Sequence, residues 1–524
     1  MTTVNQKRIA VNTLLLYFRM VIMTFVGLYT SRVIIDSLGQ THFGIYDAVG
    51  AIVTMVSFIS TTMSSACQRF YSYEMERNGM EELRKVFCIS MTVFFILTAI
   101  ILLLSETAGS WYLVNKMDVN GEIEAAKWVF QFSILSFSLQ ILRVPYMGMV
   151  IAREKMKIFA YLSLFEAFAA LGIALFISHT ADDKNARLVL YAGLMSGTQI
   201  VMYLFYWLYC RLFYRECRFR FMIDKDKFRE IFSYAGWNMI GASANVLKSQ
   251  GINLLLNASF GVIVSAARGI GYKVYSTIAQ LNDNFFTAVR PQLYKSFAAG
   301  EMKDMHKLIC QSTRFSFYLL FLLALPILLE TDFILPVWLK GRNVSGYAFI
   351  LTRLMLIEGL VNCFTNPLAT SIQATGNVRN YQIVIGCTLL TILPLSYLGI
   401  RYLNWAPSSV FIVSITVTVF TQVLRLLFVR KQVGLDPAAY IKGVFVPIAG
   451  VAAISVSISL IIRHTAHLFL HQHIWLRSLS VIGSSMIVLC ITVFIIGITK
   501  TERKHILEVI TAFLKKIKLR KSYD

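Results

Sequence analysis

Long apolar runs alternate with short polar connections from one end of the chain to the other. A helix needs about 20 residues to cross a bilayer, and fourteen runs are long enough. They cover 9–36, 42–70, 84–113, 123–151, 156–178, 187–213, 228–256, 262–290, 305–329, 346–373, 378–402, 406–430, 441–463 and 474–499. This pattern predicts an all-α polytopic membrane protein and not a set of soluble domains.

An internal repeat relates the first six predicted helices to the next six at one offset of 222 residues. The matched positions are Ser37-Leu38-Gly39 with Ser259-Phe260-Gly261, Cys88 with Cys310, Pro145 with Pro367, and Ala152 with Ala374. Six is even, so both halves enter the membrane from the same side, and the predicted pseudo-twofold axis runs along the membrane normal. Two such bundles leave a cleft between them in which transporters of this kind bind substrate.

The repeat divides the chain into four predicted parts. Residues 1–222 form an N-terminal six-helix lobe with a cytoplasmic linker, and 223–435 form a C-terminal six-helix lobe. Residues 436–499 supply two extra C-terminal helices, 13 and 14, outside the repeat. Residues 500–524 are a basic amphipathic tail, because from Glu502 onwards apolar side chains recur at helical spacing against lysines. We expect this tail to lie on the cytoplasmic membrane surface.

The charge of the chain is concentrated in its connections. Of 524 residues, 56% are hydrophobic and 15% charged, and the net charge is +22. Alternate connections hold 32 Lys and Arg on one side and 10 on the other, which predicts that both termini are cytoplasmic. The linker Arg211–Arg229 mixes basic and aromatic residues, but it is short and flanked by membrane helices. It therefore favours contact with anionic lipid headgroups over nucleic acid.

The sequence lacks the residues that several classes of function require. No GxxxxGK[ST] loop and no nucleophile–base arrangement occur, so we expect neither an ATPase nor an enzyme, and no cofactor. Eight cysteines are scattered without a CxxC pair, which predicts neither a disulfide framework nor a metal site. The cluster His464, His467, His471 and His473 has spacing that suits a metal, but interfacial histidines are commoner.

The segment Gly261–Pro291 carries charges inside an apolar background: Arg268, Lys273 and Asp283. A full charge at the centre of a membrane helix costs about 2.5–3.5 kcal/mol, so such residues normally face protein or water. Together with Arg19 and Lys248, which also lie deep in predicted helices, we expect Arg268 and Lys273 to line a cationic cavity for an anionic ligand such as a diphosphate.

One alternative interpretation of the deep charges stays open. Arg19 or Lys273 could instead neutralise Asp47 or Asp283 in an intramembrane ion pair. The basic residues do not recur at the offset, since Arg19 aligns with Gly241 and Arg268 with Tyr46. A requirement of packing would tend to recur in both halves, so this asymmetry favours function.

Two acids and two prolines complete the candidate residues. Glu166 and Glu358 are either proton- or cation-coupling acids or buried partners of Arg143 or Arg353. Pro145 and Pro367 occupy equivalent places in helices 4 and 10. Each is either a gating kink or a kink tolerated by packing.

Four stretches carry a family resemblance: 37–70 (SLGQTHFGIYDAVGAIVTMVSFISTTMSSACQRF), 144–161 (VPYMGMVIAREKMKIFAY), 366–382 (NPLATSIQATGNVRNYQ) and 266–274 (AARGIGYKV). They resemble the Wzx-like O-antigen and polysaccharide flippases of the multidrug/oligosaccharidyl-lipid/polysaccharide exporter (MOP) superfamily. The resemblance implies a V-shaped pair of six-helix lobes plus two extra helices. It also implies export of an undecaprenyl-diphosphate-linked oligosaccharide by alternating access.

The resemblance also assigns roles to residues. In related lipid II flippases, arginines in helices 1 and 8 bind the diphosphate, and Arg19 and Arg268 match them in helix and approximate depth. The helix 2 arginine of those relatives has no counterpart here, where Tyr46 and Asp47 occupy the region.

The predicted function is therefore a flippase for a lipid-linked O-antigen or capsule-type repeat unit in polysaccharide or lipopolysaccharide biosynthesis. The expected location is the bacterial cytoplasmic (inner) membrane. Expected partners are the lipid-linked oligosaccharide, anionic membrane lipids and a polysaccharide polymerase or assembly protein. The alternatives are a cation-coupled multidrug antiporter of the same fold and a non-transporting scaffold of a polysaccharide synthesis complex.

Overall fold

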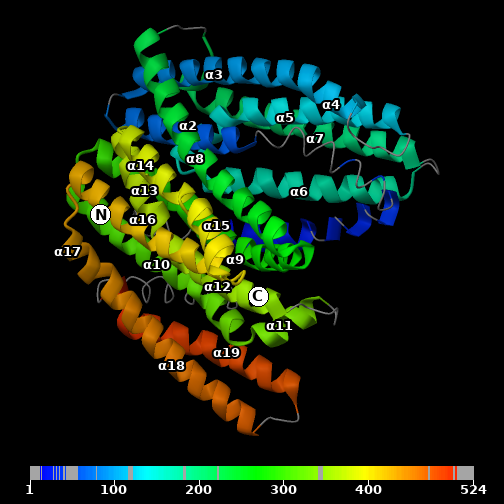
Figure 1. The fold of residues 1–524 in the computed structure, drawn as a ribbon. Helices are drawn as coiled ribbons and strands as arrows, with labels where there is room; N and C mark the ends of the chain where they lie inside the picture. Colours follow the sequence, from blue (N-terminus) through cyan, green and yellow to red (C-terminus); the bar gives the residue numbers. More distant parts are fainter. Residues whose placement is uncertain are drawn as a thin grey trace, which may run out of the picture.

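The computed structural model describes residues 12, 15–27, 29–30, 32–34, 36–38, 42, 46, 57–77, 79–115, 122–180, 184–220, 224–339, 346–469, 473–499 and 502–503. Long helices dominate these ranges, and no strand occurs in them (Figure 1). The predicted all-α class is confirmed.

Eleven helices within these ranges are long and apolar enough to cross a membrane. Helices α8 (Lys225–Phe260) and α9 (Val262–Ala298) are not among them, although they contain 36 and 37 residues. Polar and charged side chains interrupt their apolar stretches. The predicted span 42–70 falls partly outside the described residues, and α2 (Ser57–Arg77) is the described helix that overlaps it. The number fourteen therefore stays a prediction.

The helices follow the order expected of two related halves. The first half contains a helix within Leu15–Leu38, α2, α3 (Gly79–Leu104), α4 (Ser110–Asn115), α5 (Ile123–Ala152), α6 (Met156–Ser178) and α7 (Lys184–Phe213). The second half contains α8, α9, α10 (Met302–Leu329), α11 (Thr331–Trp338), α12 (Gly346–Asn362), α13 (Thr365–Thr375), α14 (Arg379–Leu390), α15 (Ile392–Leu403) and α16 (Ser409–Val433). These bounds are compatible with the offset of 222, and the four-part division of the chain stays a prediction.

The two aligned prolines lie in helices of different continuity. Pro145 is buried inside α5, which continues through it as one helix. Pro367 is the third residue of α13, and the helix preceding it ends at Asn362. Proline has no N–H to donate, and its ring crowds the carbonyl four residues earlier, here that of Cys363. The second half is therefore interrupted where the first half is not.

The last helices pack along one side of the second half. After the short α17 (Pro437–Tyr440), α18 (Val446–Phe469) and α19 (Ile474–Thr492) form an antiparallel pair that contacts α10. Figure 1 shows this pair on the side of the second half that faces away from α3, α5 and α7.

The two halves meet through α2, which packs against both α8 and α9. Charged pairs join the halves here. Lys227 Nζ lies 2.8 Å from Glu74 Oε1, and Arg69 Nη1 lies 3.7 Å from Glu230 Oε1. Lys295 bonds to Glu154. We call this end, where Lys227, Lys295 and Arg69 pair with carboxylates of the other half, the basic end of the molecule.

Gly376 allows one of these contacts. It ends α13 with a positive φ of 82°, which glycine adopts without strain. A Cβ at this position would lie 2.5 Å from Arg69 Nη2. The same nitrogen donates to the carbonyl oxygen of Ala374 at 3.4 Å. The absence of a side chain at residue 376 therefore lets Arg69 reach from the first half to the backbone of the second.

Glu502, the first residue of the predicted surface tail, is buried. Its carboxylate accepts a hydrogen bond from Arg314 Nη2 at 2.6 Å and one from the backbone N–H of Thr499 at 2.7 Å. The side chains of Arg314 and Glu502 are 8% and 7% exposed. The tail thus starts with an internal ion pair to α10, and the prediction for residues beyond Arg503 lies outside the described residues.

We predict that Lys227→Ala lowers the free energy of unfolding by about 3 kcal/mol. Glu74 is 2% exposed, and a hydrogen bond between charged groups contributes about 1.5–3 kcal/mol. Thermal unfolding of the purified protein checks this. Lys225→Ala is the matched control, because this neighbouring lysine is exposed. Equal melting temperatures for both variants would contradict a stabilising contact between the halves.

We also predict that the effect of truncating the tail depends on Glu502. A chain that stops after Arg503 keeps the Arg314–Glu502 pair and should melt like the full chain. A chain that stops after Lys500 leaves Arg314 buried without this carboxylate and should melt at a lower temperature. If both truncations behave alike, the ion pair does not anchor this part of the chain.

Candidate functional site

One buried polar cluster lies in the second half where α8, α12 and α16 meet. Lys248 Nζ donates to Glu358 Oε1 at 2.6 Å, and Ser414 Oγ donates to the same oxygen at 2.8 Å. The lysine and glutamate side chains are 12% and 13% exposed. Lys248 was predicted as a lining cation and Glu358 as a coupling acid or a partner of arginine. The structure places them together as an ion pair.

Arg268 extends this cluster from α9. Its Nη2 donates to the backbone oxygen of Ser249 at 2.8 Å and to Ser249 Oγ at 3.2 Å. The guanidinium carbon lies 5.7 Å from the centroid of the Tyr272 ring, and Glu358 is an electrostatic neighbour. Because Glu358 pairs with Lys248 and is also an electrostatic neighbour of Arg268, the same cluster contains two cations and one carboxylate.

Arg268 has no carboxylate in direct contact among the residues that the structure describes. The side chain is 8% exposed, and its Nε has no hydrogen-bond partner within that part of the chain. Asp283 lies 15 positions further along α9, which corresponds to about 22 Å of helix rise. Arg268 is thus a buried cation held by neutral acceptors and an aromatic ring.

The cations of the first half are arranged differently. Arg19 Nη1 lies 3.5 Å from Asn284 Oδ1 on α9 of the other half, and its guanidinium carbon is 4.6 Å from the Phe159 ring centroid. Arg143 Nη1 lies 3.3 Å from Glu166 Oε2, and Gln199 donates to Glu166 Oε1 at 2.9 Å. Glu166 was predicted to be either a coupling acid or the buried partner of an arginine. In the structure it forms an ion pair with Arg143.

The other predicted pairings differ from those in the structure. Arg353, a candidate partner of Glu358, instead donates to Asp332 Oδ2 at 2.8 Å, because it projects toward α11 at the end of the helix opposite the basic end. Lys273 and Asp283 are both exposed, and the electrostatic neighbours of Asp283 include Arg290 and Asn366. Asp47 lies outside the described residues.

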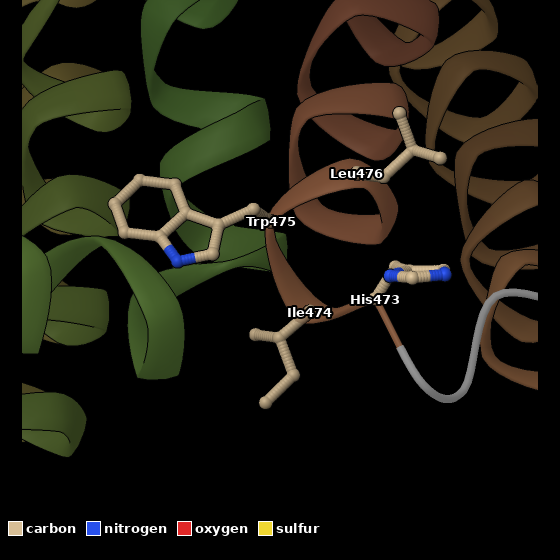
Figure 2. A pocket seen from close by; sticks show the side chains of 4 residues that line it. All are labelled: His473, Ile474, Trp475 and Leu476. Carbon is tan, nitrogen blue, oxygen red and sulfur yellow. The ribbon is translucent and has the colours of Figure 1, made fainter.

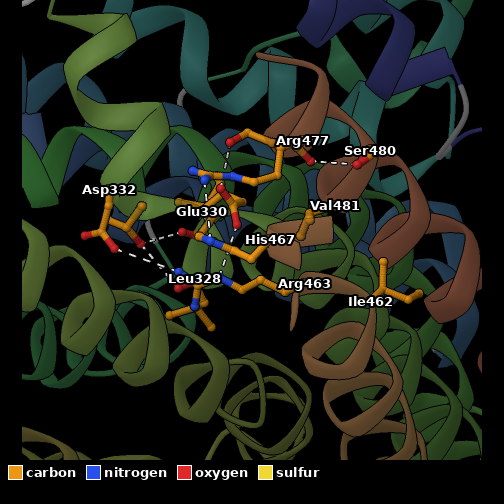
Figure 3. Close-up of polar contacts among 12 residues, drawn as sticks. Leu328, Glu330, Asp332, Ile462, Arg463, His467, Arg477, Ser480 and Val481 are labelled. Carbon is orange, nitrogen blue, oxygen red and sulfur yellow. Dashed lines mark hydrogen bonds and ion pairs between the residues drawn. The ribbon is translucent and has the colours of Figure 1, made fainter. Parts of the chain in front are cut away.

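A charged cluster that the sequence reading missed joins α18 and α19 to the second half (Figure 3). Arg463 Nε lies 3.2 Å from Glu330 Oε1, and Ser478 Oγ donates to Glu330 Oε2 at 2.8 Å. Arg477 and His467 lie 3.4 Å apart. The signal in the sequence is the pair Glu330 and Asp332 between Pro326 and Pro336, but the sequence does not identify the arginine that pairs with them.

The hollow beside this cluster is small and lies at the first turn of α19. It has a volume of about 500 Å³ and is lined by His473, Ile474, Trp475 and Leu476 (Figure 2). The Trp475 ring meets Phe333 edge-on at 5.1 Å. In the described part of the chain, no three His, Cys, Asp or Glu residues come together as a metal site, and His471 lies outside it.

No protein-family model matches this sequence, and no curated protein sequence matches it. Solved structures do. An outward-facing multidrug resistance MATE family transporter of the MOP superfamily superposes with a TM-score of 0.71 at 11% identity, covering 82% of this chain and 96% of that chain. A MATE structure in a bent conformation gives 0.69 at 12% identity, covering 84% and 96%.

A MOP superfamily transporter from Pyrococcus furiosus gives a TM-score of 0.68 at 11% identity and covers 83% of this chain and 96% of that chain. Its structure is described as having a binding pocket of reverse polarity that suggests a different function. Identities this low show shared fold and leave function to the residues of the site. This chain has the fold of the MATE transporters of the MOP superfamily.

Proposed function

We propose that this chain is a membrane transporter that moves an undecaprenyl-diphosphate-linked oligosaccharide from the inner to the outer leaflet of the bacterial cytoplasmic membrane. The MATE-like fold supports transport by alternating access of the two halves. The observation that carries the choice of an anionic substrate is Arg268, buried and held only by Ser249 and Tyr272 in the described part of the chain.

The chemistry of Arg268 suits a diphosphate. A guanidinium presents several N–H donors in a planar fork that can bind two phosphate oxygens at once. Its Nε is buried without a partner in the described ranges, so a donor remains for a ligand. Moving a diphosphate through the membrane interior removes its water, and fixed cations must replace that water. Lys248, which has Glu358 as a charged neighbour in common with Arg268, supplies a second positive charge.

The contact between the halves fits a state closed on the cytoplasmic side. The distribution of Lys and Arg assigns the basic end to the cytoplasm, and Glu74, Glu154 and Glu230 bind lysine or arginine of the other half at this end. In a transporter closed there, access to the substrate site is from the opposite side, the outer leaflet. Opening toward the cytoplasm requires these pairs to separate.

A cation-coupled multidrug antiporter is the second candidate, because the MATE structure with a TM-score of 0.71 is described as a multidrug resistance transporter. Such a protein needs acids that are free to bind a cation. Here Glu166 already holds Arg143, and Glu358 already holds Lys248. These pairs favour the anionic substrate.

We predict that Arg268→Ala reduces export of the lipid-linked glycan at least tenfold at equal protein level, because the diphosphate loses its bidentate donor. Arg268→Lys should restore only part of the export, since an ammonium group is a point charge without the planar fork. The measurement is the accumulation of undecaprenyl-linked glycan in cells that depend on each variant, determined by lipid mass spectrometry.

Arg425→Ala is the matched control for damage to the fold. Arg425 is also buried in the second half, but it donates to the hydroxyls of Tyr381 and Thr421, both at 3.1 Å, and not to Glu358 or Ser249. Export should survive this change at equal protein level. Normal export by Arg268→Ala would exclude the cationic site as the substrate site and would favour the antiporter.

A further inference from the structure

We propose that Glu358 is a resident counter-anion that competes with the substrate for the cations of the second half. The inference rests on the proposed function and names the residue that sets the affinity of the site. In the structure, Glu358 compensates the charge of Lys248 and acts on that of Arg268. The diphosphate of the substrate takes its place beside these cations when it binds.

Glu358 accepts two hydrogen bonds, one from a charged donor and one from a neutral donor, on two different helices. Lys248 Nζ and Ser414 Oγ both donate to Oε1, at 2.6 and 2.8 Å. Lys248 belongs to α8, the helix whose Ser249 accepts the hydrogen bond of Arg268. Ser414 belongs to α16 on another side. Glu358 can therefore release Lys248 and keep a hydrogen-bond donor.

The charges of the cluster determine the direction of the competition. Two cations and one carboxylate leave an excess of one positive charge in a buried place. A diphosphate brings at least two negative charges, and its charge-assisted hydrogen bonds to Lys and Arg are roughly twice as strong as bonds between neutral groups. Arg268 exchanges the neutral acceptors of Ser249 for phosphate oxygens, so the substrate wins against the single carboxylate.

The remaining carboxylate limits how tightly the substrate is held. Glu358 stays on α12 near the bound diphosphate, and like charges within about 4–6 Å repel. This repulsion makes the loaded site less stable than one formed by the two cations alone. A transporter must release its cargo as well as bind it, and a substrate bound too tightly stays in the site. Glu358 thus lowers the affinity for the substrate and makes its release easier.

The test uses the full-length protein in lipid nanodiscs with farnesyl diphosphate and farnesyl monophosphate as probes. Glu358→Gln keeps the shape and the Ser414 contact but removes the charge. We expect its Kd for farnesyl diphosphate to fall about tenfold. The gain should be smaller for the monophosphate, because the repulsion scales with ligand charge. Glycan export by the same variant in cells should slow, since release becomes limiting.

A second pair of variants keeps the test decisive if Glu358→Gln destabilises the fold. Glu358→Gln leaves Lys248 buried without its carboxylate, whereas Lys248→Gln with Glu358→Gln removes both charges. The double variant should bind farnesyl diphosphate more tightly than Lys248→Gln alone. Asp332→Asn, which removes the carboxylate paired with Arg353, is the control and should leave the Kd unchanged.

The outcomes separate this inference from the proposed function. Wild-type protein that binds farnesyl diphosphate, together with unchanged or weaker binding after Glu358→Gln in both backgrounds, would overturn the role of Glu358 alone. An equal gain for both probes would also overturn it, because a general structural change does not follow ligand charge. Wild-type protein that does not prefer the diphosphate would overturn the anionic site itself.

Discussion

A charge inside a helical membrane bundle has to be compensated, because neither lipid nor apolar side chains replace the water it loses. The chain meets this constraint in two ways. Arg143 is compensated by a carboxylate, Glu166, and its pair is complete. Among the residues that the structure describes, Arg268 is compensated by the dipoles of Ser249 and the ring of Tyr272, with the Glu358 charge acting from nearby. A complete pair stabilises a helix contact, whereas an incomplete one leaves a field that attracts an anion.

The arrangement of the halves connects this field to transport. Arg19 belongs to the first half, and its acceptor Asn284 belongs to α9, the helix that also carries Arg268. The cations of the two halves therefore keep a fixed relation only while the halves keep theirs. The pairs at the basic end, such as Lys227 with Glu74, hold that relation in this structure. Movement of the halves against each other would change the cation arrangement and the access to it together.

The sequence predicts the fold better than the site, for a physical reason. Apolar runs of spanning length are a local signal, so the helices and their order could be predicted. Deep charges are rare, so the sequence also identifies Arg268, Lys248 and Glu358 as unusual. It does not say which of them meet. Glu358 follows Arg353 by five positions on one helix, yet it bonds to Lys248, 110 positions away. Such pairs depend on which face of each helix packs against the neighbouring helix.

Helix continuity shows the same limit. Pro145 and Pro367 are equivalent in sequence, but α5 continues through the first, and a break between α12 and α13 precedes the second. A proline weakens a helix by a fixed local rule, and the surrounding packing decides whether the helix stays whole. Pro145 lies in a buried stretch of α5 that packs on α2 and α7.

The difference between the halves argues for a substrate and against symmetric scaffolding. The two halves share their helix pattern, but Arg268 and Lys248 have no basic counterpart at the repeat offset, since Tyr46 and Val26 occupy those positions. If only stability mattered, every buried charge would be expected to form an ion pair, as Arg143 does with Glu166. Arg268 is instead buried without a carboxylate in direct contact in the part of the chain that the structure describes, and this arrangement costs stability. This arrangement suits the anionic substrate proposed above, because that substrate would bring the missing negative charge.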